Sequence, residues 1–426
     1  MSDLQHRLGS LVVEHPVILG MTADGKAVSL VGAIETGGQM NLFAPEAGDT
    51  IITAPHAYIG GHFRREADAK FRRMALKISL LDSWFPPPLI DRRTDLWHGK
   101  LRRSVLAFEP AQNVGAKMPF GTLTFGHDFE ATGNLRTEAH LTQSAALVAT
   151  TDRQQPLEWW LTTVVKPLRF LLSISTELPI SVETIRLRPW ITKTDGEVEV
   201  IWANDLPAQD RPELHQAQML LGYEDLAGRF EQALRAWFIA VEELEEILDQ
   251  FFATYHTARS FVETRFTMTV SAAEAYHRER IGGTDAPADV HRGRMAQARS
   301  GVDERHLEWL NQRLNNEPTL VRRIVELCEL VPAVAKLMIG DDAKAFARQL
   351  RDARNFRTHL DPRRRSATER LHLVRLTSQL AVILEAAILH RELGFEPTDI
   401  AQRVVRASRL RRLAIQAGRS AVTNSS

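Results

Sequence analysis

The chain has a single cysteine, no excess of charge of either sign and no long apolar run. Because Cys328 stands alone, a disulfide framework and a cysteine-rich zinc site are excluded, and its apolar helical neighbours indicate a buried structural thiol. Fifty-three basic residues balance fifty-three acidic ones among 426 residues. Any affinity for nucleic acid must therefore come from local clusters of charge.

Targeting and membrane-spanning segments are also missing from the pattern. Charged residues such as Asp3, Arg7 and Glu14 interrupt the first twenty residues, so no signal-peptide core is recognisable. No stretch approaches the roughly 20 apolar residues of a membrane span. We expect a cytoplasmic protein with no membrane partner.

Patterns that hold metals or nucleotides are absent as well. Gly37-Gly38 and Gly60-Gly61 lack the spacing of a phosphate-binding loop, and we interpret them as turns. Five histidines show no zinc-site spacing: His62, His98, His127, His140 and His306. The sequence predicts neither a metal nor another cofactor.

Short β-rich runs separated by turn residues extend from about residue 10 to about residue 205. Examples are residues 28–31, 50–53 and 74–80. Asp24-Gly25 and Gly37-Gly38 are typical of hairpin turns, and one helix is expected near residues 159–172. This half predicts a mainly antiparallel β domain.

The polar segment from Asn204 to Pro212 separates the β-rich part of the sequence from a part with helical periodicity. The first pattern is an apolar seam with alternating spacings of four and three, which predicts one helix of about 35 residues. Its members are Phe230, Leu234, Trp237, Val241, Leu244, Leu248 and Phe251. The seam could pack within its own domain or against the same helix of a second subunit.

Several helix ends are recognisable further along. Pro318 is expected just inside one start, Asp341 and Asp342 precede another, residues 366–369 form a capping box, and Gly394 closes the last helix. We predict four or five helices between about residues 260 and 395. The chain is thus an α+β multidomain protein: a β domain over 1–210, a connecting helix over 211–260, an all-α bundle over 261–396 and a basic helix or tail over 397–426.

The segment around Arg354-Asn355 carries the candidate chemistry, because His359 follows the arginine by five residues. On an ideal helix this spacing turns the two side chains about 140° apart, with about 7.5 Å of rise. A straight helix cannot aim both at one phosphate. Either the last turn loosens near Pro362, or two copies of the segment face each other in a dimer.

This segment resembles the R-N-x-x-x-H signature of HEPN domains. Residues 271–278 and 384–395 resemble that family's first and closing helices, and residues 57–63 and 77–84 resemble the N-terminal domain of ApeA-like proteins. The resemblance implies a β-rich sensor domain before an all-α HEPN bundle, in a bacterial anti-phage defence protein. HEPN toxins silenced by adenylylation carry tyrosine where this chain has Asp361, so control by a cognate nucleotidyltransferase is not expected.

Chemistry and charge agree with this resemblance. A histidine can take the proton of an RNA 2′-hydroxyl or protonate the leaving 5′-oxygen. The guanidinium group of an arginine can stabilise the negatively charged phosphorane. Between residues 344 and 375 the sequence has ten basic residues and only three acidic ones, Asp352, Asp361 and Glu369. The basic residues are Lys344, Arg348, Arg351, Arg354, Arg357, Arg363, Arg364, Arg365, Arg370 and Arg375. Such a cluster is typical of a site for a polyphosphate ligand.

The leading hypothesis is a metal-independent endoribonuclease with Arg354 and His359 as its catalytic pair. The supporting or RNA-binding residues would be Asn355, Arg351, Arg357, Arg363, Arg364 and Arg365. Activated when the N-terminal domain senses infection, it would cut host RNA, with tRNA as a candidate, and halt growth. Its partners would be RNA, further copies of itself as a homodimer or higher oligomer, and a phage-encoded trigger protein. The alternatives are a non-catalytic nucleotide- or RNA-binding module and a dimeric scaffold.

Overall fold

The computed structural model describes residues 14–39, 49–85, 91–107, 112–134, 138, 140–189, 196–202, 214–256, 261–313, 316–359, 370–407 and 410. The chain divides into two compact units. The β unit comprises Met1–Leu172, Ile180–His215 and Gly222–Arg235, and the helical unit comprises Ser173–Pro179, Gln216–Leu221 and Ala236–Ser426. The predicted domain boundary at residues 204–212 lies outside the described residues and stays a prediction.

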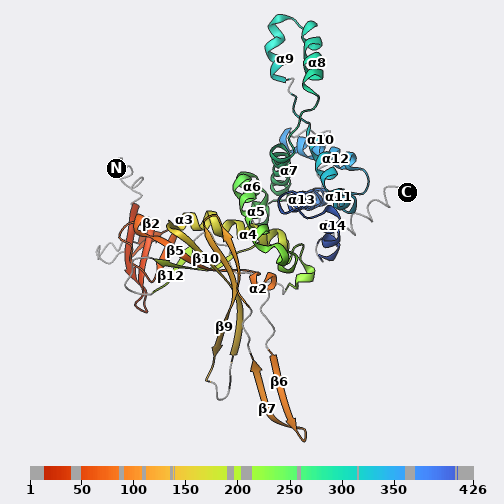
Figure 1. Cartoon of the computed structure of the whole chain (residues 1–426). Coiled ribbons are helices and arrows are strands. Elements are labelled where there is room, and N and C mark those ends of the chain that lie inside the picture. Colours follow the sequence, from red (N-terminus) through yellow and green to blue (C-terminus); the bar gives the residue numbers. More distant parts are fainter. Residues whose placement is uncertain are drawn as a thin grey trace, which may run out of the picture. The chain divides into compact units, whose positions relative to one another are not determined.

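A large antiparallel sheet forms the β unit (Figure 1). Its strands lie in the order β1-β2-β4-β12-β11-β5-β10-β9-β8, with β3 beside β2. Their bounds are β1 Glu14–Met21, β2 Ala27–Gln39, β3 Asp49–Thr53, β4 His56–Ile59, β5 Lys70–Ile78, β8 Val114–Met118, β9 Gly121–Thr132, β10 His140–Pro156, β11 Val182–Pro189 and β12 Val198–Trp202. The predicted antiparallel β domain is confirmed.

One face of this sheet is covered by a helical segment. It consists of α3 (Leu157–Trp160), a π-helical turn (Leu161–Val165) and α4 (Lys166–Thr176), which together confirm the helix expected at residues 159–172. Helix α3 packs on β5 and β10, and Trp160, Phe71 and Leu147 are fully buried. Burying side chains of this size supplies roughly 1.5–3 kcal/mol each, which holds the segment on the sheet.

The two predicted hairpin turns had different outcomes. Asp24-Gly25 does connect β1 to β2, and Gly25 has φ +82° as such turns require. Gly37 and Gly38 lie inside β2 instead, where the register against β3 shifts between Glu35 and Gly37. The prediction of a turn there was wrong, because a glycine pair also accommodates a bulge within a strand.

A separate two-stranded sheet consists of β6 (Asp91–Trp97) and β7 (Lys100–Ala107). Near β9, the short helix α2 (Leu81–Trp84) contributes Trp84 to an aromatic cluster. The ring of Trp84 lies 6.1 Å from that of Phe125 and 6.4 Å from that of Phe230. Residues just before the helical unit are thereby tied into the core of the β unit.

The predicted seam is present, but it runs along two helices. Helix α5 (Phe230–Glu243) ends where α6 (Glu245–His256) begins, so the single helix of about 35 residues is interrupted at Leu244. All seven seam side chains are buried within the chain itself. Packing inside the protein therefore accounts for the seam, and it offers no free surface to a second subunit.

The helical unit continues with α7 (Val262–Arg280), α8 (Ala288–Ser300), α9 (Leu307–Arg313), α10 (Leu320–Leu330), α11 (Pro332–Ile339), α12 (Ala343–His359), α13 (Arg370–Leu393) and α14 (Pro397–Arg406). Described residues 261–393 thus form seven helices, where four or five were predicted. One reason is that Pro332 starts a new helix directly after α10.

Helix α13 is the centre of this unit and packs against α7, α10, α11 and α14. It is apolar around most of its circumference, as a helix surrounded by others must be. By length and composition it could cross a membrane, which differs from the expectation drawn from the sequence, but 67% of the apolar window is buried. We interpret α13 as a core helix.

The predicted helix ends can be compared with the structure one by one. The Oδ1 atom of Asp342 accepts a hydrogen bond from the Ala345 amide at 2.7 Å, and Gly394 ends α13 with φ +65°, so both ends are confirmed. Pro318 was misplaced, because Thr319 caps α10 and the proline precedes that cap. Residues 366–369 lie outside the described residues.

Candidate active site

Helix α12 carries five of the predicted site residues. Its buried side consists of Phe346, Ala347, Leu350 and Ala353, and it packs mainly against α10. These apolar positions recur at helical spacing, so the remaining positions face away from the core. The amphipathic pattern therefore fixes which side chains of α12 are accessible.

Arg354 lies on the accessible side, with 44% of its side chain exposed. Its Nη2 atom lies 3.5 Å from Oε2 of Glu274 on α7. Such a long, partly exposed contact is worth at most about 1 kcal/mol, so it orients the guanidinium without locking it. The side chain of Arg354 is therefore reached by solvent beside the carboxylate of Glu274.

Arg351 points its guanidinium at its neighbour. Both Nε and Nη2 donate to the same Asp352 oxygen, Oδ1, at 3.0 and 2.9 Å. This pair is also partly exposed, with 41% of the Arg351 side chain accessible. The carboxylate of Asp352 offsets part of the positive charge beside Arg354.

The structure describes the other predicted residues only in part. Asn355 is half-buried on α12. The backbone of Arg357 and His359 is described and is α-helical to the end of α12, whereas their side chains lie outside the described residues. Arg363, Arg364 and Arg365 lie outside them entirely. The structure therefore brings Arg354, Arg351 and Asn355 onto one helix and leaves the other assignments as predictions.

The regular helical backbone of α12 determines how positions 354 and 359 are placed around the helix axis. Because α12 stays α-helical through His359, residues 354 and 359 differ by about 500° of rotation, or about 140° around the axis. No loosening of the helix occurs before the histidine. The backbone of one α12 therefore places positions 354 and 359 on different faces of the helix.

Glu274 is a site residue that sequence reasoning did not identify as functional. It lies on α7 within the segment 271–278, among the buried residues Ala273 and Tyr276. Eighty positions separate it from Arg354. The only sequence signal was one acidic residue among the several charged residues of α7, which does not reveal a partner so far along the chain.

Two buried polar contacts hold α7 in place beside this site. Glu392 of α13 accepts hydrogen bonds from the Tyr276 hydroxyl at 2.9 Å and from Nε of Arg280 at 3.0 Å. Burial, reinforced by the charge of Glu392, raises the pKa of Tyr276 far above its usual range. A neutral phenol that donates to a carboxylate fixes the rotation of α7, and with it the position of Glu274.

His277 provides the second contact, with its Nε2 atom 2.6 Å from Oε2 of Glu326 on α10. Its side chain is completely buried. Burial lowers the pKa of His277 below the usual 6.5, although the hydrogen bond and charge of Glu326 act in the opposite direction. We infer that the folded protein keeps this imidazole neutral near neutral pH.

The lowered pKa of His277 predicts a loss of stability in mild acid. As the pH falls through 6.5, the unfolded chain takes up a proton that the folded chain resists, so the free energy of unfolding decreases. Urea unfolding followed by circular dichroism at pH 7.5 and 5.5 measures this. In the His277→Gln variant, the difference between the free energies of unfolding at the two pH values should be smaller than in the wild type. An unchanged difference would contradict the neutral state inferred for His277.

Among the described residues, no three histidine, cysteine, aspartate or glutamate side chains lie together so as to hold a metal ion. The expectation that the chemistry needs no metal rests on the arginine–histidine pair and stays a prediction.

Comparison with known families adds to this geometry. The sequence model described as ApeA N-terminal domain 1 matches residues 6–237, more than half of the chain. The model described as Apea-like HEPN matches residues 267–399. The chain belongs to the ApeA family. It is an anti-phage defence protein with a HEPN module, and HEPN domains are typically ribonucleases.

The two matches coincide with structural features described above. The ApeA N-terminal match extends to residue 237, and Phe230 packs with Trp84 and Phe125 in the β unit. The HEPN match contains α12 and Glu274. The resemblance and the fold class predicted from sequence are both confirmed. Searches of curated proteins and of solved structures gave no match.

Proposed function

We propose that this ApeA-family protein is a metal-independent endoribonuclease that cuts host RNA, with tRNA as a candidate, when its N-terminal half senses infection. The observation that carries the proposal is the placement of Arg354. It lies on the accessible side of α12, within the HEPN match, beside the carboxylate of Glu274 that orients it.

The proposed reaction uses the nucleophile that RNA itself provides. His359 takes the proton from a 2′-hydroxyl, whose oxygen attacks the adjacent phosphorus, and the bond to the 5′-oxygen breaks. The planar guanidinium of Arg354 donates hydrogen bonds to the phosphate oxygens as negative charge develops on them. A second imidazole protonates the leaving oxygen, which yields a 2′,3′-cyclic phosphate and a 5′-hydroxyl.

A homodimer supplies this second imidazole and also solves the geometric problem of α12. Since one helix turns residues 354 and 359 about 140° apart, the arginine of one copy and the histidine of the other would act on the same phosphate. The two His359 side chains then divide the roles of base and acid. We propose that two α12 helices form one cleft.

The cationic residues near α12 would hold the RNA backbone. We propose this role for Arg351, Arg357, Arg363, Arg364 and Arg365, and a supporting hydrogen bond for Asn355. A phage-encoded protein is the proposed trigger, acting on the N-terminal half, and the cytoplasm is the proposed location, without a membrane partner.

Incubation of the purified protein with total RNA in EDTA tests the proposal. We expect fragmentation of the RNA that EDTA does not prevent, once the protein is activated by co-expressed phage proteins. RNA that stays intact in every activated state would favour a HEPN module that binds nucleotides or RNA without cutting them.

The contact with Glu274 predicts a moderate effect on activity and a small one on stability. Glu274→Gln removes the charge that orients Arg354, so RNA cleavage should fall severalfold while stability changes by less than about 1 kcal/mol. The matched control is Glu279→Gln, an exposed position on the same helix. Equal cleavage rates for the two variants and the wild type would show that Glu274 does not position Arg354.

A further inference from the structure

The β6–β7 hairpin is built to hold its tip in a fixed shape. The strands pair antiparallel from Asp91↔Ala107 to Trp97↔Lys100. His98 and Gly99 join them with φ +47° and +75°, the left-handed conformations of a two-residue turn that matches the twist of the strands. The backbone at the tip is therefore defined by the hairpin's own hydrogen bonds.

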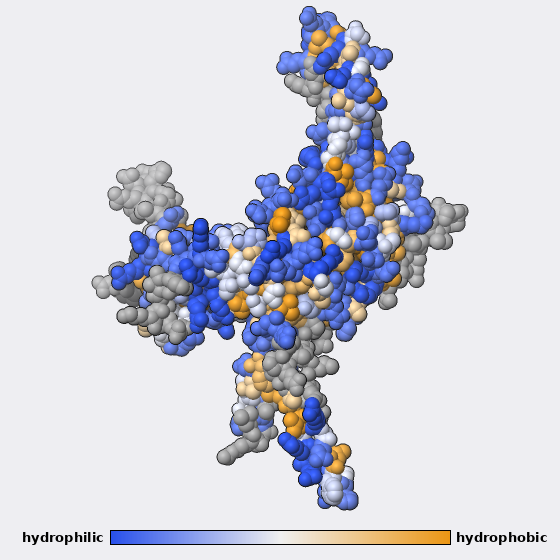
Figure 2. All heavy atoms as spheres, in the orientation of Figure 1, coloured by the Kyte–Doolittle hydropathy of each residue, from blue (hydrophilic) through white to orange (hydrophobic). Residues whose placement is uncertain are grey.

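Large apolar side chains on this hairpin are exposed (Figure 2). Trp97 is 64% exposed, Leu101 65% and Leu96 60%, with Leu106 at 54%. A two-stranded hairpin is marginally stable by itself, and exposed aromatic and aliphatic side chains do not help to keep it folded. A bound partner would explain why the sequence places them here.

Positive charge surrounds these apolar side chains. The described cationic side chains are Arg93, Lys100, Arg102 and Arg103, and the acidic one is Asp95, whose carboxylate lies 3.9 Å from Arg102. This excess of positive charge occurs in a protein whose total charge is zero. It is complementary to a polyanion.

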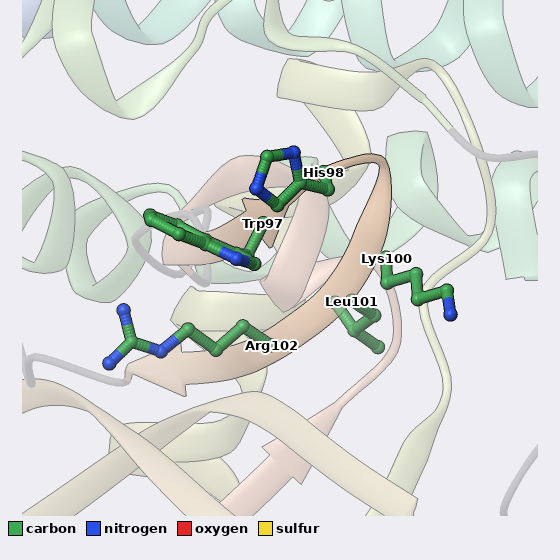
Figure 3. Close-up of a pocket in the computed structure, with 5 residues that line it drawn as sticks. All are labelled: Trp97, His98, Lys100, Leu101 and Arg102. Carbon is green, nitrogen blue, oxygen red and sulfur yellow. The ribbon is translucent and has the colours of Figure 1, made fainter.

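Aromatic and cationic groups meet in one hollow at the tip (Figure 3), lined by Trp97, His98, Lys100, Leu101 and Arg102. The rings of Trp97 and His98 lie edge to face, 5.0 Å apart at an interplanar angle of 83°. An exposed indole accepts a stacked base, and the neighbouring lysine and arginine reach the phosphates on either side of it.

We propose that the tip of the β6–β7 hairpin binds a single-stranded segment of RNA, with a base stacked on Trp97 and phosphates held by Lys100, Arg102 and Arg103. Single strands are favoured because the faces of their bases are free, whereas those in a duplex are covered. An acidic protein would match the charge, but it would not require an exposed indole in the same hollow as the cationic side chains. This inference rests on the proposed function, because it assigns a second contact to the same substrate.

Fluorescence anisotropy with the full-length protein tests the proposal. The probe is a labelled single-stranded RNA of about 15 nucleotides with 2′-O-methyl groups, which the proposed mechanism cannot cleave. Trp97→Ala should weaken binding roughly tenfold, because it removes the surface on which a base stacks. Replacing Arg102 and Arg103 by glutamine should reduce the slope of log affinity against log salt by about 1.4, at about 0.7 for each phosphate that is no longer neutralised.

Two controls isolate the hairpin. Lys26→Glu reverses an exposed lysine beside the β1–β2 turn, and it should leave RNA affinity unchanged, whereas Lys100→Glu should reduce it severalfold. A duplex of the same sequence should bind Trp97→Ala as well as it binds the wild type.

Binding of the single strand that is equal for wild type, Trp97→Ala and the double glutamine variant would overturn the proposal. The exposed side chains would then be left to a protein partner. Because the probe cannot be cut, this result is independent of catalysis. Loss of RNA cleavage in an Arg354 variant that binds the probe normally would still support the proposed function.

Discussion

Arg354→Ala and His359→Ala should each lower the rate of RNA cleavage by roughly 10²–10⁴-fold. The alanine at 359 removes the group that moves the proton, and the alanine at 354 removes the cation that faces the developing phosphorane charge. Single-turnover cleavage of a labelled RNA in EDTA measures both rates. Since Arg354 is partly exposed and its contact with Glu274 is long, the variant should fold normally.

The Arg354→Lys variant tests whether cleavage depends on the positive charge alone or also on the planar shape of the guanidinium. Lysine keeps the positive charge but lacks the planar fork, so its cleavage rate should lie between those of wild type and alanine. Arg348→Ala, on the same helix, is the control for loss of an exposed charge. If growth arrest on overproduction and RNA cleavage both persist in Arg354→Ala and His359→Ala, the catalytic assignment fails and the scaffold hypothesis gains.

Mixing the two inactive variants should restore part of the activity. In a dimer formed from Arg354→Ala and His359→Ala chains, the arginine of one copy and the histidine of the other remain, while the second imidazole is lost. Half of the dimers are mixed under random pairing, and these should cleave RNA faster than either parent but more slowly than the wild type, because water must protonate the leaving oxygen. Co-expression with two different affinity tags, followed by purification through both, enriches the mixed dimer.

This complementation depends on α12 being helical through His359. If both side chains came from the same copy, no combination of the two variants would contain an intact pair, and the mixture would stay as inactive as its parents. Complete absence of recovery, with mixed dimers verified by both tags, would therefore contradict the site shared between subunits.

Local sequence signals predicted several parts of the fold correctly. Asp342 caps α12 because a short carboxylate can accept from free amides at a helix start, and Gly394 ends α13 because it adopts a positive φ. The seam from Phe230 to Phe251 was recognisable because its period needs no knowledge of its partner. Each of these signals is contained within a few turns of chain.

Other features depend on distant residues and were missed. The interruption at Leu244 is not visible in a seam whose period continues unchanged. Strands β6 and β7 were not predicted, because both of their faces are exposed and the alternation of apolar and polar residues that marks a half-buried strand is lost. Hairpins without a buried face leave a weak signal.

For the candidate site too, sequence reasoning identified residues that are neighbours along the chain but missed a distant one. Arg354, Asn355 and His359 could be selected from one short segment, since a signature of six residues carries them. Glu274 could not, because its role follows from the packing of α7 beside α12, eighty positions away. The proposed sharing of the site between two subunits likewise depends on the helical course of α12 up to its last residue.

The decisive experiment on the chemistry is cleavage, in EDTA, of an RNA with one 2′-deoxy substitution at a mapped cut site. We predict that the unmodified RNA yields a 2′,3′-cyclic phosphate and a 5′-hydroxyl, and that the substituted RNA stays intact at that position. Cleavage of the substituted RNA at an unchanged rate, or products with a 5′-phosphate, would show that an arginine and a histidine acting on the RNA's own hydroxyl are not the machinery of this protein.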